Sequence, residues 1–242
     1  MVEIALCLAI IGFAMVAIIG VLPTGVRVQQ DNREETIINE DGLFLVEAIR
    51  SGSRGLDYLT NYVDSITITN SLRQSTQFTY APVDSDTTFS NGSQILGLLT
   101  TPRFVRVGGV TITNSTSMIM RSLSGSALMQ SRESRDFAFT YRVVAEMIPM
   151  SIHPASYTNY LASGLLPDEL TARSNNWRVA RSVESNFHEL RLTLQWPVFQ
   201  QGNRLQIGSN RKTLRTLVNG LVAGEIPEGL YHVNPSRYGR VF

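Results

Sequence analysis

Few residues in this 242-residue chain have the spacing that catalysis or metal binding requires. The three histidines, His153, His188 and His232, lie far apart and are interpreted as ordinary surface or interface residues. Asp84 and Asp86 are weak candidates for holding a cation, but their spacing does not fit an EF-hand loop. The sequence contains no phosphate-cradling glycine loop and no G-x-S-x-G nucleophile motif. It therefore predicts no catalytic residue, no cofactor and no metal beyond the weak Asp84/Asp86 candidate.

Sites for covalent chemistry are equally few. Cys7 is the only cysteine, so no disulfide can form within the chain. It lies inside an apolar run, where a cysteine behaves as a small hydrophobic residue. Asn91-Gly92-Ser93 and Asn114-Ser115-Thr116 match the N-glycosylation pattern, and we expect both to be polar loops.

The composition is that of a folded protein without a strong electrostatic field. Hydrophobic residues make up 43% of the chain and charged residues 17%. The 21 basic and 20 acidic residues leave a net charge of +1, so no long-range attraction toward nucleic acid is evident.

The strongest pattern is an apolar run from Ile4 to Leu22, preceded by Glu3 and followed by Pro23. About 20 apolar residues are enough to cross a bilayer as a helix. Because no basic residue precedes the run and Pro23-Thr24-Gly25 is a poor cleavage site, we expect the run to remain in the mature protein. A charge at the edge of such a run is unfavourable unless it is paired. Glu3 is therefore expected to need a partner.

The sequence predicts that residues 1–25 form a transmembrane or filament-core helix. Gly12, Gly20 and Pro23 each weaken a helix, proline most of all, so this segment is the place where helical structure is expected to be lost most easily.

Residues 26–63 are expected to continue the helix as an amphipathic segment. Apolar residues recur there at helical spacing, and Asp41 falls in the same stripe as Leu45, Ala48 and Ile49. Gly52 and a second glycine at position 55 indicate the end of the long helix, and one more short helical turn is expected from Leu56 to Val63.

Residues 64–242 are predicted to form a β-rich globular domain, because short runs of alternating polarity replace the helical pattern. The overall fold class is therefore α+β, with a long N-terminal helix packed on an antiparallel β-rich domain. The expected strands are Ser65–Thr69, Gln77–Tyr80, Arg103–Val107, Phe137–Val143, His188–Trp196, Arg204–Ile207 and Lys212–Val218. The expected polar loops are Asp84–Ser93, Asn114–Thr116, Ser124–Arg135 and Tyr157–Asn176.

The N-terminal pattern resembles the type IV pilin superfamily, which includes the pseudopilins of type II secretion. The resemblance covers about the first 30 residues and rests on Glu3, on Leu8-Ala9-Ile10-Ile11-Gly12, on the apolar Val16–Leu22 and on Pro23. A weaker likeness, to minor members of the family, lies in the strand that ends at Trp196. In the family a short basic leader and two further residues precede the position of Met1, and they are not found here.

The resemblance implies a structural subunit of a type IV pilus-like extracellular filament. It implies that the apolar helix lies in the bacterial inner membrane before assembly and then packs against other copies in a helical homo-oligomer. Glu3 would pair with the N-terminal amine of a neighbouring subunit, and the helix from Gly12 to Pro23 would partly lose its hydrogen bonds in the filament. Prepilin peptidase and the assembly machinery are implied as further partners.

Two alternatives remain open at this point. The first is a minor pilin or a pseudopilin of a type II secretion system, which acts in the periplasm without forming a long surface fibre. The second is a periplasmic binding protein or enzyme that is anchored by a single helix. The second alternative requires a pocket with converging polar groups, and the sequence supplies no motif for one.

Overall fold

The computed structural model of the chain describes residues 2–52, 56–82, 85–107, 110–123, 139–150, 167–201, 204–225 and 231–235. The chain divides into two compact units, Met1–Glu40 and Asp41–Phe242. The fold class is α+β, as the sequence predicts, with a long N-terminal helix followed by a sheet-rich domain.

The long helix α1 runs without interruption from Val2 to Ser51, through Pro23. It ends where Gly52 adopts a φ of +59°, a left-handed conformation that glycine takes without a steric penalty. The predicted helix end is thus confirmed, and the short turn that follows is the 3₁₀ helix η1 (Asp57–Asn61). The predicted amphipathic segment 26–63 is therefore too long, because α1 stops at residue 51.

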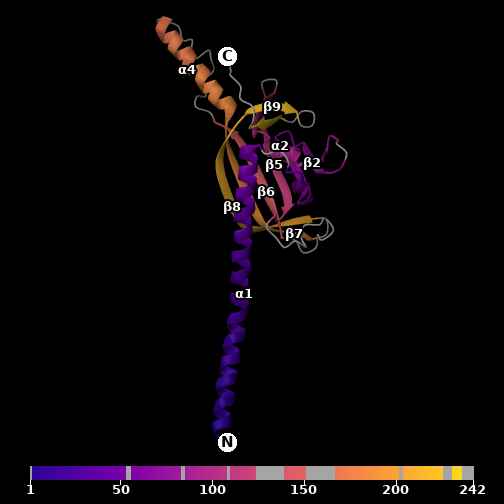
Figure 1. The fold of residues 1–242 in the computed structure, drawn as a ribbon, viewed down its shortest axis with the longest axis vertical. Helices are drawn as coiled ribbons and strands as arrows, with labels where there is room; N and C mark the ends of the chain where they lie inside the picture. Colours follow the sequence, from indigo (N-terminus) through magenta and orange to yellow (C-terminus); the bar gives the residue numbers. More distant parts are fainter. Residues whose placement is uncertain are drawn as a thin grey trace. The chain divides into compact units, whose positions relative to one another are not determined.

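The second unit is built on one large sheet with the strand order β3-β2-β1-β5-β6-β7-β8, and β4 pairs with β5 beside this path (Figure 1). Neighbouring strands are antiparallel except for the short parallel pair β2 and β3. The strands are β1 (Val63–Asn70), β2 (Ser75–Tyr80), β3 (Thr88–Phe89), β4 (Phe104–Val107), β5 (Val110–Arg121), β6 (Thr140–Pro149), β7 (Phe187–Gln201) and β8 (Arg204–Asn219). A separate hairpin pairs β9 (Leu221–Glu225) with β10 (Tyr231–Asn234).

The core lies on one face of the sheet, where the last turns of α1 pack. Strand residues alternate between buried and half-buried, as the two faces of a sheet require, and Leu45 and Ile49 of α1 are buried. Helix and sheet approach closely at Gly42, because a Cβ on this residue would lie 2.7 Å from Cδ1 of Leu214 and 3.4 Å from Cδ1 of Leu194. A larger side chain at position 42 would require the side chain of Leu214 to move.

The opposite face of the sheet is polar. Arg191 donates two hydrogen bonds to the carboxylate of Glu189, of 2.8 and 2.9 Å, and the hydroxyls of Thr193 and Thr213 are 3.0 Å apart. Half-exposed pairs of this kind contribute little to stability because water competes for them. This face is therefore compatible with solvent, whereas the other face needs the cover of α1.

The short helix α2 (Gly92–Leu99) begins within the predicted loop Asp84–Ser93, and the strand β3 also lies inside that range, so the loop prediction is corrected there. Asn91 begins it as a helix cap, since its side-chain oxygen accepts a hydrogen bond of 2.9 Å from the backbone N–H of Gln94. The backbone N–H of Gly92 donates to the carboxylate of Asp57 at 3.1 Å and thereby ties α2 to η1.

The predicted loop Tyr157–Asn176 is wrong over residues 167–176, which belong to the helix α4 (Pro167–Asn186). The earlier part of that loop lies outside the described residues, as does the predicted loop Ser124–Arg135. Most of α4 is exposed, with only Ala180 and Asn186 buried among its residues. Trp177 is half-buried, and the guanidinium of Arg181 lies 5.9 Å from the centre of its ring.

One loop prediction and one strand prediction are also corrected. Asn114–Thr116 lies within β5 rather than in a loop, because these residues pair with β1. The predicted strands Arg204–Ile207 and Lys212–Val218 are parts of the single strand β8, which stays paired to β7 along nearly its whole length.

Candidate functional site

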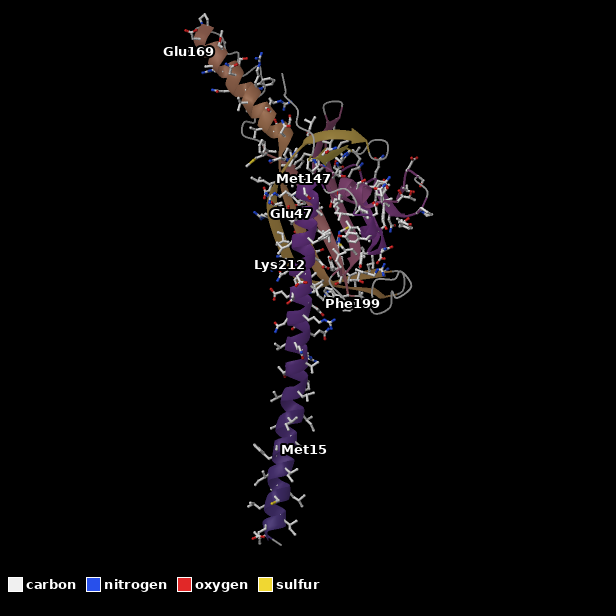
Figure 2. The ribbon with its side chains drawn as sticks, in the orientation of Figure 1. Met15, Glu47, Met147, Glu169, Phe199 and Lys212 are labelled. Carbon is white, nitrogen blue, oxygen red and sulfur yellow. The ribbon has the colours of Figure 1, made fainter. Side chains whose placement is uncertain are left out.

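The first half of α1 presents apolar side chains on every side. Every residue from 2 to 33 is exposed, including Phe13 at 79% and Ile19 at 70%, and the side chains around Met15 radiate from the helix in all directions (Figure 2). By length and composition alone, this helix is a candidate membrane span, with a mean hydropathy of 2.9 in its most apolar window. Because so much apolar surface is unfavourable in water, an apolar environment such as the interior of a membrane would stabilise this helix.

Glu3 is the charged group of this apolar segment. It lies in the first turn of α1, and the next charged residue along the chain is Arg27. The unsatisfied N–H groups of a helix N-terminus favour a carboxylate at that position. In an apolar environment, however, the carboxylate needs a cationic partner as well. Pairing of Glu3 with the N-terminal amine of a neighbouring subunit stays a prediction.

The predicted weak points of the helix, Gly12, Gly20 and Pro23, all lie within the continuous α1. A Cβ on either Gly12 or Gly20 would have no atom within 4 Å in this single chain. Packing within the chain therefore does not explain these glycines. Pro23 still removes one backbone donor from the helix. Loss of helical structure there during assembly stays a prediction.

In the second unit, α1 is held to the sheet by a buried carboxylate. Asp41 is 1% exposed, and its Oδ2 accepts hydrogen bonds of 2.9 Å from the hydroxyl of Tyr141 and of 2.9 Å from the backbone N–H of Leu123. Burial raises the pKa of the Tyr141 hydroxyl well above its usual value, and the charge and hydrogen bond of Asp41 raise it further. The hydroxyl of Tyr141 therefore stays protonated at ordinary pH and remains a donor to Asp41.

A second buried charge fastens η1 to the sheet. Arg121, at the end of β5, is 3% exposed and donates a hydrogen bond from Nη2 to the backbone oxygen of Asn61. Its Nε lies 3.7 Å from Oδ1 of Asp64. For Tyr141 the sequence holds a signal, a hydroxyl-bearing residue in phase with the buried Val143, but Arg121 is out of phase with the buried Met118 and Met120 and no alternation marks it.

The interpretation of the histidines as surface or interface residues is wrong for His188. This side chain is 1% exposed at the start of β7, where it faces the core. Burial lowers the pKa of His188 from 6.5 to about 4, because the charged imidazolium is poorly solvated there. His232 is half-buried in β10, and His153 lies outside the described residues.

Acidification is expected to destabilise the second unit through His188. The unfolded side chain binds a proton near pH 6.5 and the folded one only near pH 4, so stability is complete above pH 6.5 and falls as the pH drops toward 4. A shift of this size corresponds to about 3 kcal/mol. Urea unfolding at pH 7, 5.5 and 4 should show that His188→Leu loses less stability over this range than the parent. Equal losses in the two proteins would contradict the assignment, since their other titrating groups are the same.

The weak candidates for a metal receive no support from the described residues. Asp86 is exposed in a turn before β3, and Asp84 lies outside the described residues. Within the described part of the chain, no group of three or more His, Cys, Asp or Glu side chains could hold a metal ion. Both asparagines of the glycosylation pattern are engaged in the fold, Asn91 as the cap of α2 and Asn114 through a hydrogen bond of 3.1 Å from its Nδ2 to the backbone oxygen of Pro102.

The apolar half of α1 with Glu3 is therefore the best candidate for a functional surface. Its apolar area and its one carboxylate suit contact with lipid or with another apolar surface. Compared with family models, curated proteins and solved structures, the chain gives no match, so the function is inferred from this helix and the domain that follows it.

Proposed function

We propose that this chain is a structural subunit of a type IV pilus-like filament, assembled through its N-terminal apolar helix. The observation that carries the proposal is the first half of α1, which is apolar on all sides, exposed over its whole surface and marked by Glu3 at its start. A helix of this kind is equally well solvated by lipid tails and by other apolar helices. The helix can therefore lie in a membrane before assembly and then exchange its contacts with lipid for contacts with the same helix of other copies.

The carboxylate gives this exchange a defined register. A buried carboxylate without a partner is strongly unfavourable, whereas one that is paired is tolerated. If Glu3 meets the N-terminal amine of a neighbouring copy, only one axial offset between the two helices satisfies both charges. Repeating such a head-to-tail contact without closing a ring produces a helical fibre.

The second unit supplies the outer surface of the proposed filament. Its sheet is covered on one face by the last turns of α1 and carries polar side chains on the other, as a solvent-facing domain requires. A role as a minor pilin or a pseudopilin is a second candidate, favoured by the strand β7, in which Trp196 is buried. Both candidates place the apolar helices of several copies side by side.

Cross-linking through Cys7 tests this proposal directly. Cys7 is exposed on the apolar half of α1 and is the only cysteine of the chain. A short bis-maleimide added to membranes or to isolated fibres should produce covalent dimers, because the apolar helices of neighbouring copies lie side by side and each copy has one thiol. Denaturing gel electrophoresis measures the yield, and Cys7→Ser is the control that must give none.

The opposite result has a clear meaning. If the full chain stays a monomer under cross-linking, with no fibres in electron micrographs of the producing cells, α1 is only an anchor. The chain would then be a singly anchored periplasmic protein, and the filament proposal would fail.

A further inference from the structure

The charges of this nearly neutral chain are separated between its two units. The first unit, residues 1–40, holds two basic and five acidic residues, a charge of −3; because the whole chain carries +1, the second unit carries +4. Most of the negative charge of the first unit is concentrated in ten residues of α1, which are defined here as the acidic segment, Asp31–Glu40. Its carboxylates belong to Asp31, Glu34, Glu35 and Glu40, against the single basic residue Arg33.

The positive charge is concentrated on the edge strand of the large sheet. β8 carries four basic residues and no acidic one, and it is the last strand in the sheet order. Arg204, Arg211 and Arg215 are exposed, while Lys212 lies half-buried on the other face of the strand (Figure 2). An edge strand also presents unpaired backbone groups along one side, so it is suited to receive another chain.

The two charged surfaces are close enough in length to pair. Arg211 and Arg215 point to the same side of β8, and four residues of strand separate them by about 13 Å. With 3.6 residues per turn, Asp31, Glu34 and Glu35 lie on one side of α1 and span about 6 Å along its axis, whereas Glu40 lies on the opposite side. The long side chains of Arg211 and Arg215 must therefore converge to reach the carboxylates on one side of the helix.

We propose that β8 of one copy binds the acidic segment of α1 of another copy. The proposal rests on the proposed function, because it concerns how subunits contact each other once their apolar helices have associated. Arg211 and Arg215 face the carboxylates of the neighbouring helix, and this contact adds charge complementarity to apolar packing, which by itself selects no neighbour. Charge complementarity of this kind mainly determines which surfaces meet. Basic residues on an edge strand also have a simpler use, which is to prevent unwanted strand pairing.

Reversing the charges of each surface in the full chain distinguishes binding between subunits from protection of the strand edge. The first variant, Arg211→Glu/Arg215→Glu, makes the strand acidic, and the second, Asp31→Arg/Glu34→Arg, makes the segment of α1 basic. Each variant produced alone brings like charges together, and we expect its Cys7 cross-linking yield in membranes to fall about tenfold. A decrease of this size is expected from the loss of two surface ion pairs and the repulsion that replaces them. Produced together, the two variants bring opposite charges together again and should regain most of the parental yield.

The control is Arg173→Glu/Arg178→Glu on the exposed face of α4, which changes the net charge by the same amount and should leave the yield unchanged. Unchanged yields in the two single-surface variants, or no recovery when they are combined, would overturn the contact and leave edge protection as the role of the arginines. These outcomes are distinct from failure of the proposed function, in which the parental chain itself gives no Cys7 cross-link.

Discussion

Glu3→Gln is expected to abolish assembly while the chain still inserts into the membrane. The substitution removes the only charge between Val2 and Val26, so the apolar helix remains at least as soluble in lipid as before. In the proposed filament, however, the amine of the neighbouring copy loses its partner inside an apolar bundle. Removing one member of a buried ion pair costs about 3–5 kcal/mol, which corresponds to at least a hundredfold weaker association for each added subunit.

The measurement is the amount of sedimentable fibre and the Cys7 cross-linking yield, compared with the amount of chain in the membrane fraction. The control is Glu169→Gln, an exposed carboxylate in the first turn of α4. Both substitutions remove a favourable charge from a helix N-terminus, a loss of about 0.3–1 kcal/mol, but only Glu3 is expected to meet another subunit. Normal fibres from Glu3→Gln would show that the pairing does not determine assembly.

Local periodicity was sufficient to predict how α1 meets the sheet. The helical spacing placed Asp41 in one stripe with Leu45, Ala48 and Ile49, and all four are buried in the structure. The signal is reliable because a helix that packs on one side must repeat its buried positions every three to four residues. The alternation in β7 was equally informative, since Leu190, Leu192 and Leu194 are fully buried.

Elements without an apolar stripe were missed. α4 is mostly exposed, so its residues carry no periodic signal and look like a polar loop. α2 has eight residues, and most of them are buried, so it shows no alternation of faces. The sequence nevertheless holds a signal for the start of α2, because Asn91 followed three residues later by Gln94 is typical of a helix N-terminus.

The residues of the candidate site also fall into those that a local sequence pattern reveals and those that it does not. Glu3 and the apolar run are adjacent in the sequence, and the sequence alone was enough to recognise them. The contact between Asp41 and Tyr141 joins residues 100 positions apart, and no local pattern indicates which strand residue a helical carboxylate will meet. Asp41 was predicted to lie in the apolar stripe, but the reason for a carboxylate there appears only in the structure.

Asp41→Ala is therefore expected to be the most damaging single substitution in the second unit. It leaves the buried hydroxyl of Tyr141 and the part-buried backbone N–H of Leu123 without the carboxylate that accepts from them, and each such loss costs about 1–3 kcal/mol. We expect a loss of about 3–5 kcal/mol in the free energy of unfolding, a large part of the stability of a typical domain. Asp41→Asn should lose less, because both hydrogen bonds go to one oxygen, which an amide retains.

A double-mutant cycle with Tyr141→Phe tests whether these two side chains act together. Tyr141→Phe alone removes one hydrogen bond to a charged group, worth about 1.5–3 kcal/mol, and leaves Asp41 its bond from Leu123. If the contact is direct, the loss in the double variant Asp41→Ala/Tyr141→Phe is smaller than the sum of the two single losses by about 1–3 kcal/mol. Urea unfolding followed by the fluorescence of Trp196, which is buried in the same domain, measures all four proteins. Additive losses, or a loss below about 1 kcal/mol for Asp41→Ala, would mean that the contact between Asp41 and Tyr141 does not hold α1 on the sheet.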